Sequence, residues 1–168
     1  GDSEAFQVQL RKKFLEAYGL LDDELKGKEA ESAVTFCLFR LEPHHTVKAK
    51  ILELLERLPW RSEAITQCLG RFKGDEEVAH KLRMLLDKHQ VYSWHRANVL
   101  RALQDVIGAK KVADICRDWL SDNDLDWYAK SVAAEILADV PTQHAFFVER
   151  LRYEQNRTSE EDSEETAV

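Results

Sequence analysis

A few residues in this sequence have side chains that could bind a metal ion or transfer a proton. They are the dipeptide His44-His45 and the acidic pairs Asp22-Asp23 and Asp122 with Asp124. Adjacent histidines are expected to diverge, and the sequence offers no evident third ligand. Both acidic pairs precede expected helices, where an acid caps free N–H groups and complements the helix dipole. We therefore expect neither a metal site nor a cofactor.

The sequence lacks the motifs that mark common active sites. G-x-S-x-G, a phosphate-binding glycine loop, H-E-x-x-H and C-x-x-C are all absent from it. His80 and His95 lie in helical patterns, where a packed or solvated histidine is a simpler interpretation than a catalytic one. We therefore expect no catalytic residue in this chain, although a larger parent protein could still be an enzyme.

Aromatic and basic residues are interleaved near the starts of several expected helices. Such a surface could bind a protein partner, or it could hold phosphates and stack bases. Arg96 and Lys130 are 34 residues apart and would lie on one side of a regular repeat array. The simpler alternative is a solvated face of paired charges, with most of the aromatic side chains packed in the core or between repeats. The candidate surface comprises Arg61, Trp94, His95, Arg96, Arg101 and Lys130.

The elements that would position these residues are short helices. In residues 47–58, apolar residues recur at the i, i+4, i+7, i+8 spacing of an amphipathic helix, and Pro59 ends it. Strand-like alternation is absent. The same pattern predicts an all-α fold with helices near residues 4–20, 28–41, 47–58, 61–72, 75–89, 94–107, 110–121, 126–139 and 142–155.

The helices repeat with a period of 34 residues. This shift aligns Ile65 with Val99 and Ala133, and the match extends over a second helix, where Arg83 aligns with Arg117. Each helix pair has an apolar face that it cannot bury alone, so we expect stacked pairs to share one continuous core.

Two stretches of the sequence resemble the short HEAT-like repeats that are also found in phycobilisome lyase-like proteins. One is Leu69-Gly70-Arg71-Phe72 followed by Gly74-Asp75, and the other runs from the acidic turn at Asp122 to the paired alanines Ala133-Ala134. The likeness is clearest over residues 60–140. It implies an α-α superhelix, a HEAT/armadillo-like solenoid of about nine short helices, that serves as a scaffold and binds a protein partner.

A second resemblance implies an alternative function. Residues 58–64 and 92–98 look like helical segments that follow the polymerase core in some bacterial reverse-transcriptase-like proteins, although the Y-x-D-D polymerase motif is absent. This likeness implies an accessory C-terminal helical domain of an RNA-directed DNA polymerase that contacts nucleic acid.

The charge distribution separates a body from a tail. Residues 1–157 carry 24 basic and 26 acidic residues, whereas residues 158–168 add five acids and no base. We predict a helical-repeat domain over residues 1–157 and a disordered acidic tail over residues 158–168. The last residues, Glu165 to Val168, would also suit a PDZ-type groove, but a solubilising extension is the simpler interpretation.

Targeting signals and cysteine usage indicate the compartment. The sequence has no membrane-spanning run and no signal-peptide pattern, and it begins with Gly1, which suggests a piece of a larger protein. Cys37, Cys68 and Cys116 are an odd number of residues in helical apolar patterns, as expected for reduced core thiols. We therefore expect a cytoplasmic chain of unknown oligomeric state.

Overall fold

The computed structural model describes residues 3–87 and 93–165. All regular structure in these two ranges is helical, which confirms the all-α prediction. The sequence indicates one repeat domain over residues 1–157, whereas the contacts of the chain group into two compact units, residues 1–107 and residues 108–168.

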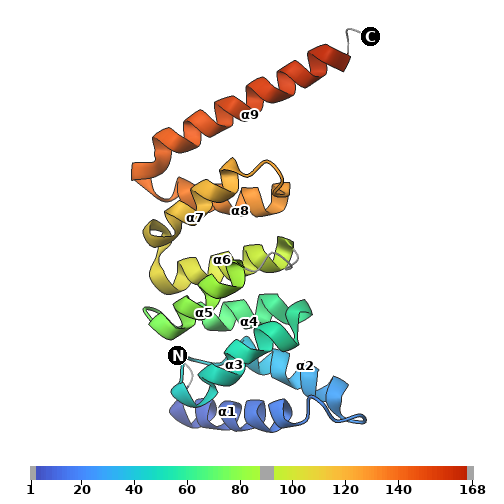
Figure 1. Ribbon diagram of the computed structural model, residues 1–168. Helices are drawn as coiled ribbons and strands as arrows, with labels where there is room; N and C mark the ends of the chain where they lie inside the picture. Colours follow the sequence, from blue (N-terminus) through green and yellow to red (C-terminus); the bar gives the residue numbers. More distant parts are fainter. Residues whose placement is uncertain (1–2, 88–92, 166–168) are drawn as a thin grey trace. The chain divides into compact units, whose positions relative to one another are not determined.

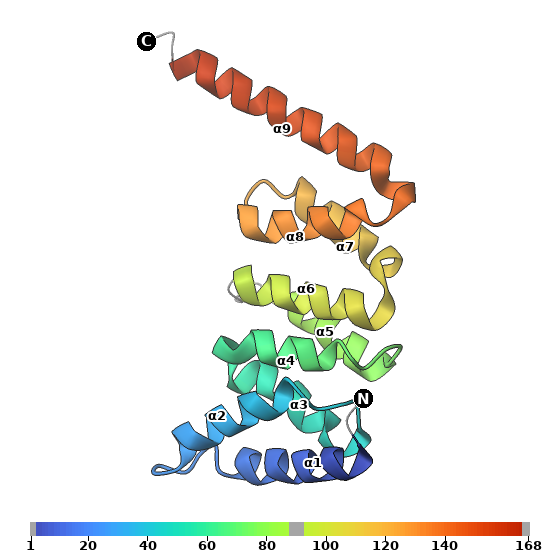
Figure 2. The same ribbon diagram turned by 180° about the vertical axis from the view of Figure 1, so that it is seen from behind.

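The first unit consists of helices packed in consecutive pairs (Figure 1). Helix α1 pairs with α2, α3 with α4, and α5 with α6, while α2, α4 and α6 also contact one another in turn (Figure 2). Their bounds are α1 Glu4–Gly19, α2 Gly27–Leu38, α3 His45–Arg57, α4 Ser62–Leu69, α5 Glu76–Leu86 and α6 Ser93–Ile107, with a short 3-10 turn at Pro59–Arg61.

Capping residues and glycines set the ends of these helices. The Asp75 side chain accepts hydrogen bonds from the backbone N–H groups of Glu77 and Val78, which have no partner within the first turn of α5. Gly74 precedes this cap with a φ of +73°, a conformation that favours glycine. Its backbone N–H donates to the carbonyl of Val106 at 2.8 Å, so this turn also contacts the end of α6.

The predicted repeat positions form the core of each unit. Ile65 and Leu69 of α4 are fully buried, and so are their counterparts 34 residues later, Val99 and Leu103 of α6. The next counterparts, Ala133 and Leu137, are buried in the second unit. The cysteines Cys37, Cys68 and Cys116 are buried and free.

Polar side chains also connect neighbouring helix pairs within the first unit. The guanidinium of Arg71, which follows α4, donates to the carbonyl oxygens of Leu38, Phe39 and Leu41 at 2.8–3.0 Å, at the end of α2. Lys73 bonds to the following helix pair instead, where it donates to the carbonyl of Asp105 in α6 at 2.8 Å. These bonds satisfy carbonyl groups that the last turn of a helix leaves without an intrahelical partner.

The second unit contains α7 Ala109–Ser121, α8 Trp127–Ala138 and α9 His144–Glu165, with a 3-10 turn at Pro141–Gln143 before α9. Helix α8 packs against both α7 and α9. Gly108, with a φ of +91°, precedes α7, and the Asp126 side chain caps α8 by accepting from the N–H groups of Tyr128 and Ala129.

The helices lie where the sequence predicts them, but α9 is longer than expected. It continues to Glu165, so residues 158–165 of the predicted disordered tail are helical, and that expectation is wrong for this stretch. The physical reason is that glutamate is a good helix former and that α9 already supplies a nucleated helix to extend. The remaining tail residues, 166–168, lie outside the described ranges, and with them most of the Glu165–Val168 motif.

Within the described ranges, none of the helices combines the length and the apolar composition that crossing a bilayer requires.

Candidate interaction surfaces

The candidate surface predicted from the sequence comprises residues of three elements: the turn before α4, helix α6 and helix α8. The first part is Arg61, in the turn before α4. The Nε of Arg61 and the indole Nε1 of Trp60 both donate to one oxygen of Glu31 in α2, at 2.9 and 2.6 Å. The hydrogen bond from Trp60, followed by that from Arg61, lowers the pKa of Glu31. The charge of Arg61 is thus partly neutralised by an acid of its own chain.

The second part lies on α6, where Trp94 and Arg101 are exposed and Arg96 is half-buried. Trp94 and Arg101 are seven residues apart, close to two helical turns, so they share one face of α6. Arg96 lies on a different face. On α6, the exposed part of the candidate surface therefore comprises Trp94 and Arg101 and is smaller than the sequence predicts.

His95 is not part of an exposed surface, and its assignment to one is wrong. Its side chain is 2% exposed, because it precedes the buried Val99 by one turn and lies on the core face of α6. Its Nδ1 has no hydrogen-bond partner among the described residues, and burial lowers the pKa of its imidazole.

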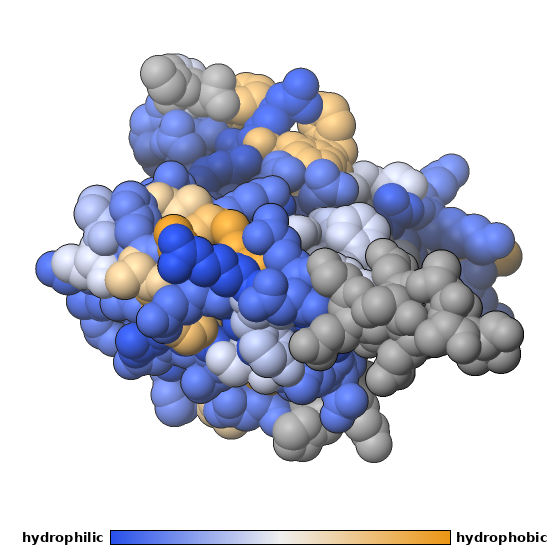
Figure 3. Space-filling model, turned by 90° about the horizontal axis from the view of Figure 1, so that it is seen from above, coloured by the Kyte–Doolittle hydropathy of each residue, from blue (hydrophilic) through white to orange (hydrophobic). Residues whose placement is uncertain are grey.

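The aromatic residues are also more exposed than expected. We expect most of them to pack inside, yet Trp60, Trp94 and Trp127 are 59%, 40% and 79% exposed, and only Trp119 among the tryptophans is buried. Tyr92 lies outside the described residues. Large aromatic side chains thus reach the surface. Figure 3 shows hydrophobic patches among hydrophilic residues on one face.

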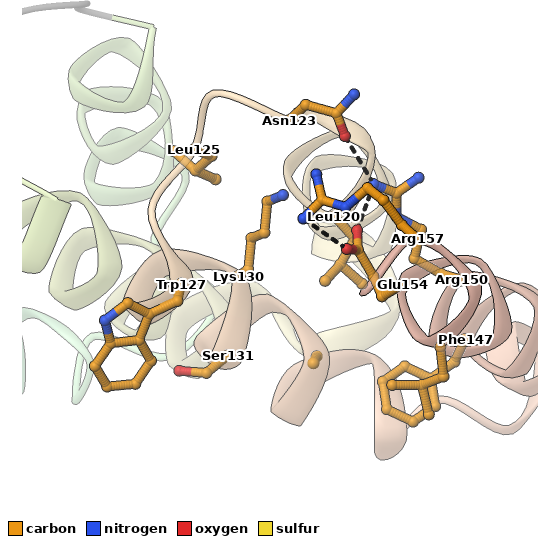
Figure 4. A pocket seen from close by; sticks show the side chains of 12 residues that line it. Leu120, Asn123, Leu125, Trp127, Lys130, Ser131, Phe147, Arg150, Glu154 and Arg157 are labelled. Carbon is orange, nitrogen blue, oxygen red and sulfur yellow. Dashed lines mark hydrogen bonds and ion pairs between the residues drawn. The ribbon is translucent and has the colours of Figure 1, made fainter. Parts of the chain in front are cut away.

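The third part is Lys130 of α8, which lies in a groove of the second unit (Figure 4). This groove, here called the α8–α9 groove, has a volume of about 430 Å³. Trp127 lies at one end, and Arg150, Glu154 and Arg157 of α9 lie on the other side of Lys130. The apolar lining residues are Leu120, Leu125, Ala134, Phe147 and Leu151.

The α8–α9 groove carries more positive than negative charge. Arg150 donates to Asn123 at 3.1 Å and pairs with Glu154 at 2.8 Å, and Glu154 also pairs with Arg157 at 3.2 Å. Among the described side chains, none forms an ion pair with Lys130. Three cations therefore face one carboxylate in the lining. Of these residues only Lys130 is predicted from the sequence, because the arginines come from a helix whose packing the repeat pattern does not specify.

A second groove, between α1 and α2 in the first unit, differs in its charge. It has a volume of about 330 Å³ and contains two lysines, Lys13 and Lys26, with two glutamates, Glu16 and Glu29. Because these charges balance, this groove selects neither an acidic nor a basic ligand. Its apolar lining includes Phe36, which is 55% exposed and stacks against Arg40.

The residues considered as metal ligands have local structural roles. The rings of His44 and His45 stack with their centroids 4.4 Å apart rather than diverging, and the Nδ1 of His44 accepts from the backbone N–H of Thr46 at the start of α3. Asp23 and Asp122 accept backbone N–H groups in their own turns. No group of three ligating side chains that could hold a metal occurs within residues 3–87 and 93–158.

No family model matches this sequence, and no curated protein and no solved structure is a significant match to it.

Proposed function

We propose that this chain is a non-enzymatic helical-repeat interaction module, and that the α8–α9 groove binds a segment of a partner protein. The observation that carries the proposal is the composition of this groove: an apolar floor, the exposed Trp127, and the cations Lys130, Arg150 and Arg157. Aromatic residues and arginines are enriched in protein interfaces, where they supply contact area and directed hydrogen bonds.

Contacts within the first unit support the repeat part of the proposal. Helices α2, α4 and α6 contact one another in turn, and Arg71 and Lys73 each bond to a neighbouring pair at a separation of 30 to 33 residues. In a HEAT/armadillo-like solenoid, each pair likewise contacts the next pair along the chain. The free, buried cysteines suit a reducing compartment such as the cytoplasm.

The charges favour a protein partner over a nucleic acid. Residues 1–107 contain 17 basic and 17 acidic residues, and residues 108–168 contain 7 basic and 14 acidic residues. Nucleic-acid surfaces need an excess of cations. Arg61 also forms an ion pair with Glu31, and His95 is buried. The reverse-transcriptase-associated alternative keeps one supporting observation, the shared exposed face of Trp94 and Arg101 on α6.

A photo-cross-linker tests the proposal. We would place p-benzoylphenylalanine at Trp127 in the full chain, irradiate it in extract of the source organism, and compare it with the same group at Lys111, which is exposed on α7 and does not line the groove. We expect adducts at position 127 that protease digests and nuclease leaves intact. Adducts that nuclease removes would favour the nucleic-acid alternative. Equal labelling at both positions would contradict binding in the groove.

A further inference from the structure

We infer that the α8–α9 groove recognises an acidic segment of the partner, in which an apolar side chain is flanked by one or two carboxylates. This inference rests on the proposed function and specifies the chemistry of the bound segment. It follows from the charges, the unused hydrogen-bond donors and the apolar floor of the groove.

The lining of the α8–α9 groove has an excess of positive charge. Glu154 holds both Arg150 and Arg157, yet one carboxylate neutralises only one of the three cations in the lining. Lys130 has no ion pair among the described side chains. The groove therefore has room for one or two further negative charges, and a ligand that brings a positive charge would be repelled.

Two arginines supply hydrogen-bond donors to the groove. A guanidinium has five N–H donors in a fixed fork, and the bonds described for Arg150 and Arg157 use only some of them. A ligand carboxylate that accepts from arginine in this groove would form the charge-assisted, directed bonds that arginine makes best.

The apolar lining of the groove is partly exposed to solvent. Leu151 is 50% exposed, and Phe147 and Leu125 are half-buried, so a ligand can remove apolar surface from water here. None of the side chains of residues 144–158 in α9 is fully buried. An apolar ligand side chain between α8 and α9 would cover these apolar residues while its acidic neighbours meet the cations of the lining.

The same features disfavour a nucleic-acid strand. The lining has two aromatic side chains, Trp127 and Phe147, which lie at opposite ends of the groove (Figure 4), so successive bases would have no row of rings on which to stack. A nucleic-acid strand also carries one negative charge at every nucleotide, whereas the three cations and one carboxylate of the groove leave an excess of two positive charges. An acidic peptide segment with one or two carboxylates matches that excess.

Peptide display tests the inference. We would select a phage-displayed library of short random peptides on the full chain, and measure synthetic versions of the enriched peptides by fluorescence anisotropy. We expect enrichment of an apolar residue beside Asp or Glu. The double variant Lys130→Glu, Arg157→Glu should bind these peptides at least about tenfold more weakly, because it turns attraction into repulsion. Higher salt should weaken binding to the unchanged chain.

A charge-matched control separates the groove from net charge. The variant Lys110→Glu, Lys111→Glu makes the same charge change on exposed residues of α7 and should bind the peptides like the unchanged chain. Circular dichroism would confirm that both variants remain helical.

The remaining outcomes would overturn the inference in distinguishable ways. Enriched peptides that lack acidic residues, or that bind the groove variant equally well, would overturn the acidic-segment inference and leave protein binding in place. No enrichment would overturn the inference as well. Groove-dependent binding of labelled oligothymidylate or oligouridylate, with no peptide enriched, would overturn both the inference and the proposed protein partner.

Discussion

Lys48 and Asp75 connect α3 to α5 through a side chain that is also a helix cap. The Nζ of Lys48 lies 3.1 Å from one carboxylate oxygen of Asp75, while the other oxygen accepts the N–H groups of Glu77 and Val78. Burial opposes ionisation of Asp75, but the hydrogen bonds from Val78 and Lys48 outweigh it, and the pKa of Asp75 is lowered. One carboxylate thus fixes the start of α5 and its contact with α3.

Two substitutions of Asp75 separate its two roles. Asp75→Ala removes both the cap and the ion pair, and we expect it to lower the free energy of unfolding by about 1 to 2 kcal/mol. Asp75→Asn keeps a capping oxygen but loses the charge, and it should cost less. Urea unfolding followed by circular dichroism would measure both. Equal losses in the two variants would show that the cap contributes nothing beyond the ion pair.

Gly70 marks a close approach between α4 and α6. A Cβ at this position would lie 2.8 Å from the Oδ2 and 3.1 Å from the Cβ of Asp105. We expect Gly70→Ala to lower the free energy of unfolding by about 1 kcal/mol, because the Asp105 carboxylate must rotate away and its Cβ must shift slightly to admit the methyl group. Gly19→Ala is the control, since a Cβ there meets nothing within 4 Å. An equal thermal midpoint for the two variants would contradict the contact.

Arg71 should contribute more stability than Lys73, although both donate to carbonyl groups at helix ends. Arg71 reaches three carbonyl oxygens and Lys73 reaches one. Hydrogen bonds to charged groups contribute about 1.5 to 3 kcal/mol, so we expect Arg71→Met to cost at least that much and Lys73→Met to cost less. Arg71→Lys should recover only part of the loss, because an ammonium cannot reproduce the guanidinium fork. Chemical denaturation would rank the three variants.

The buried His95 should make the fold sensitive to acid. Burial lowers the pKa of His95 below its ordinary 6.5, so the unfolded chain binds more protons between the folded pKa and 6.5. Stability should therefore increase with pH across that window and be lost as the pH falls through it. We expect His95→Leu to reduce the fall in thermal midpoint between neutral and mildly acidic solution. His80→Leu, at an exposed position of α5, is the control and should leave that fall unchanged.

The helices and core were predictable because their apolar spacing is local information. Each expected helix is present, and positions predicted to repeat, such as Leu69 and Leu103, are buried. The exposure of Trp60 and the burial of His95 were harder to predict from the sequence, because the same apolar period fits aromatic residues on either side of a helix. His95 could have been recognised from its spacing of four to Val99, which is the pattern of a core face.

The candidate groove could be predicted only in part. Lys130 follows from the repeat phase, but Arg150 and Arg157 depend on how α9 packs, and no repeat counterpart specifies that contact. The end of α9 was missed for a related reason. Residues 158–165 have too few apolar residues to predict burial, yet a helix that is already formed extends through acidic residues without needing a core.

The buried thiols of Cys68 and Cys116 can report local opening of the helices that contain them. Burial raises the pKa of Cys68 and of Cys116 to about 12, and each side chain is fully enclosed in a different unit. Only a thiolate exposed to solvent reacts rapidly with an alkylating reagent. A pulse of iodoacetamide followed by mass spectrometry would therefore time the opening of α4 and of α7 separately, without any added probe.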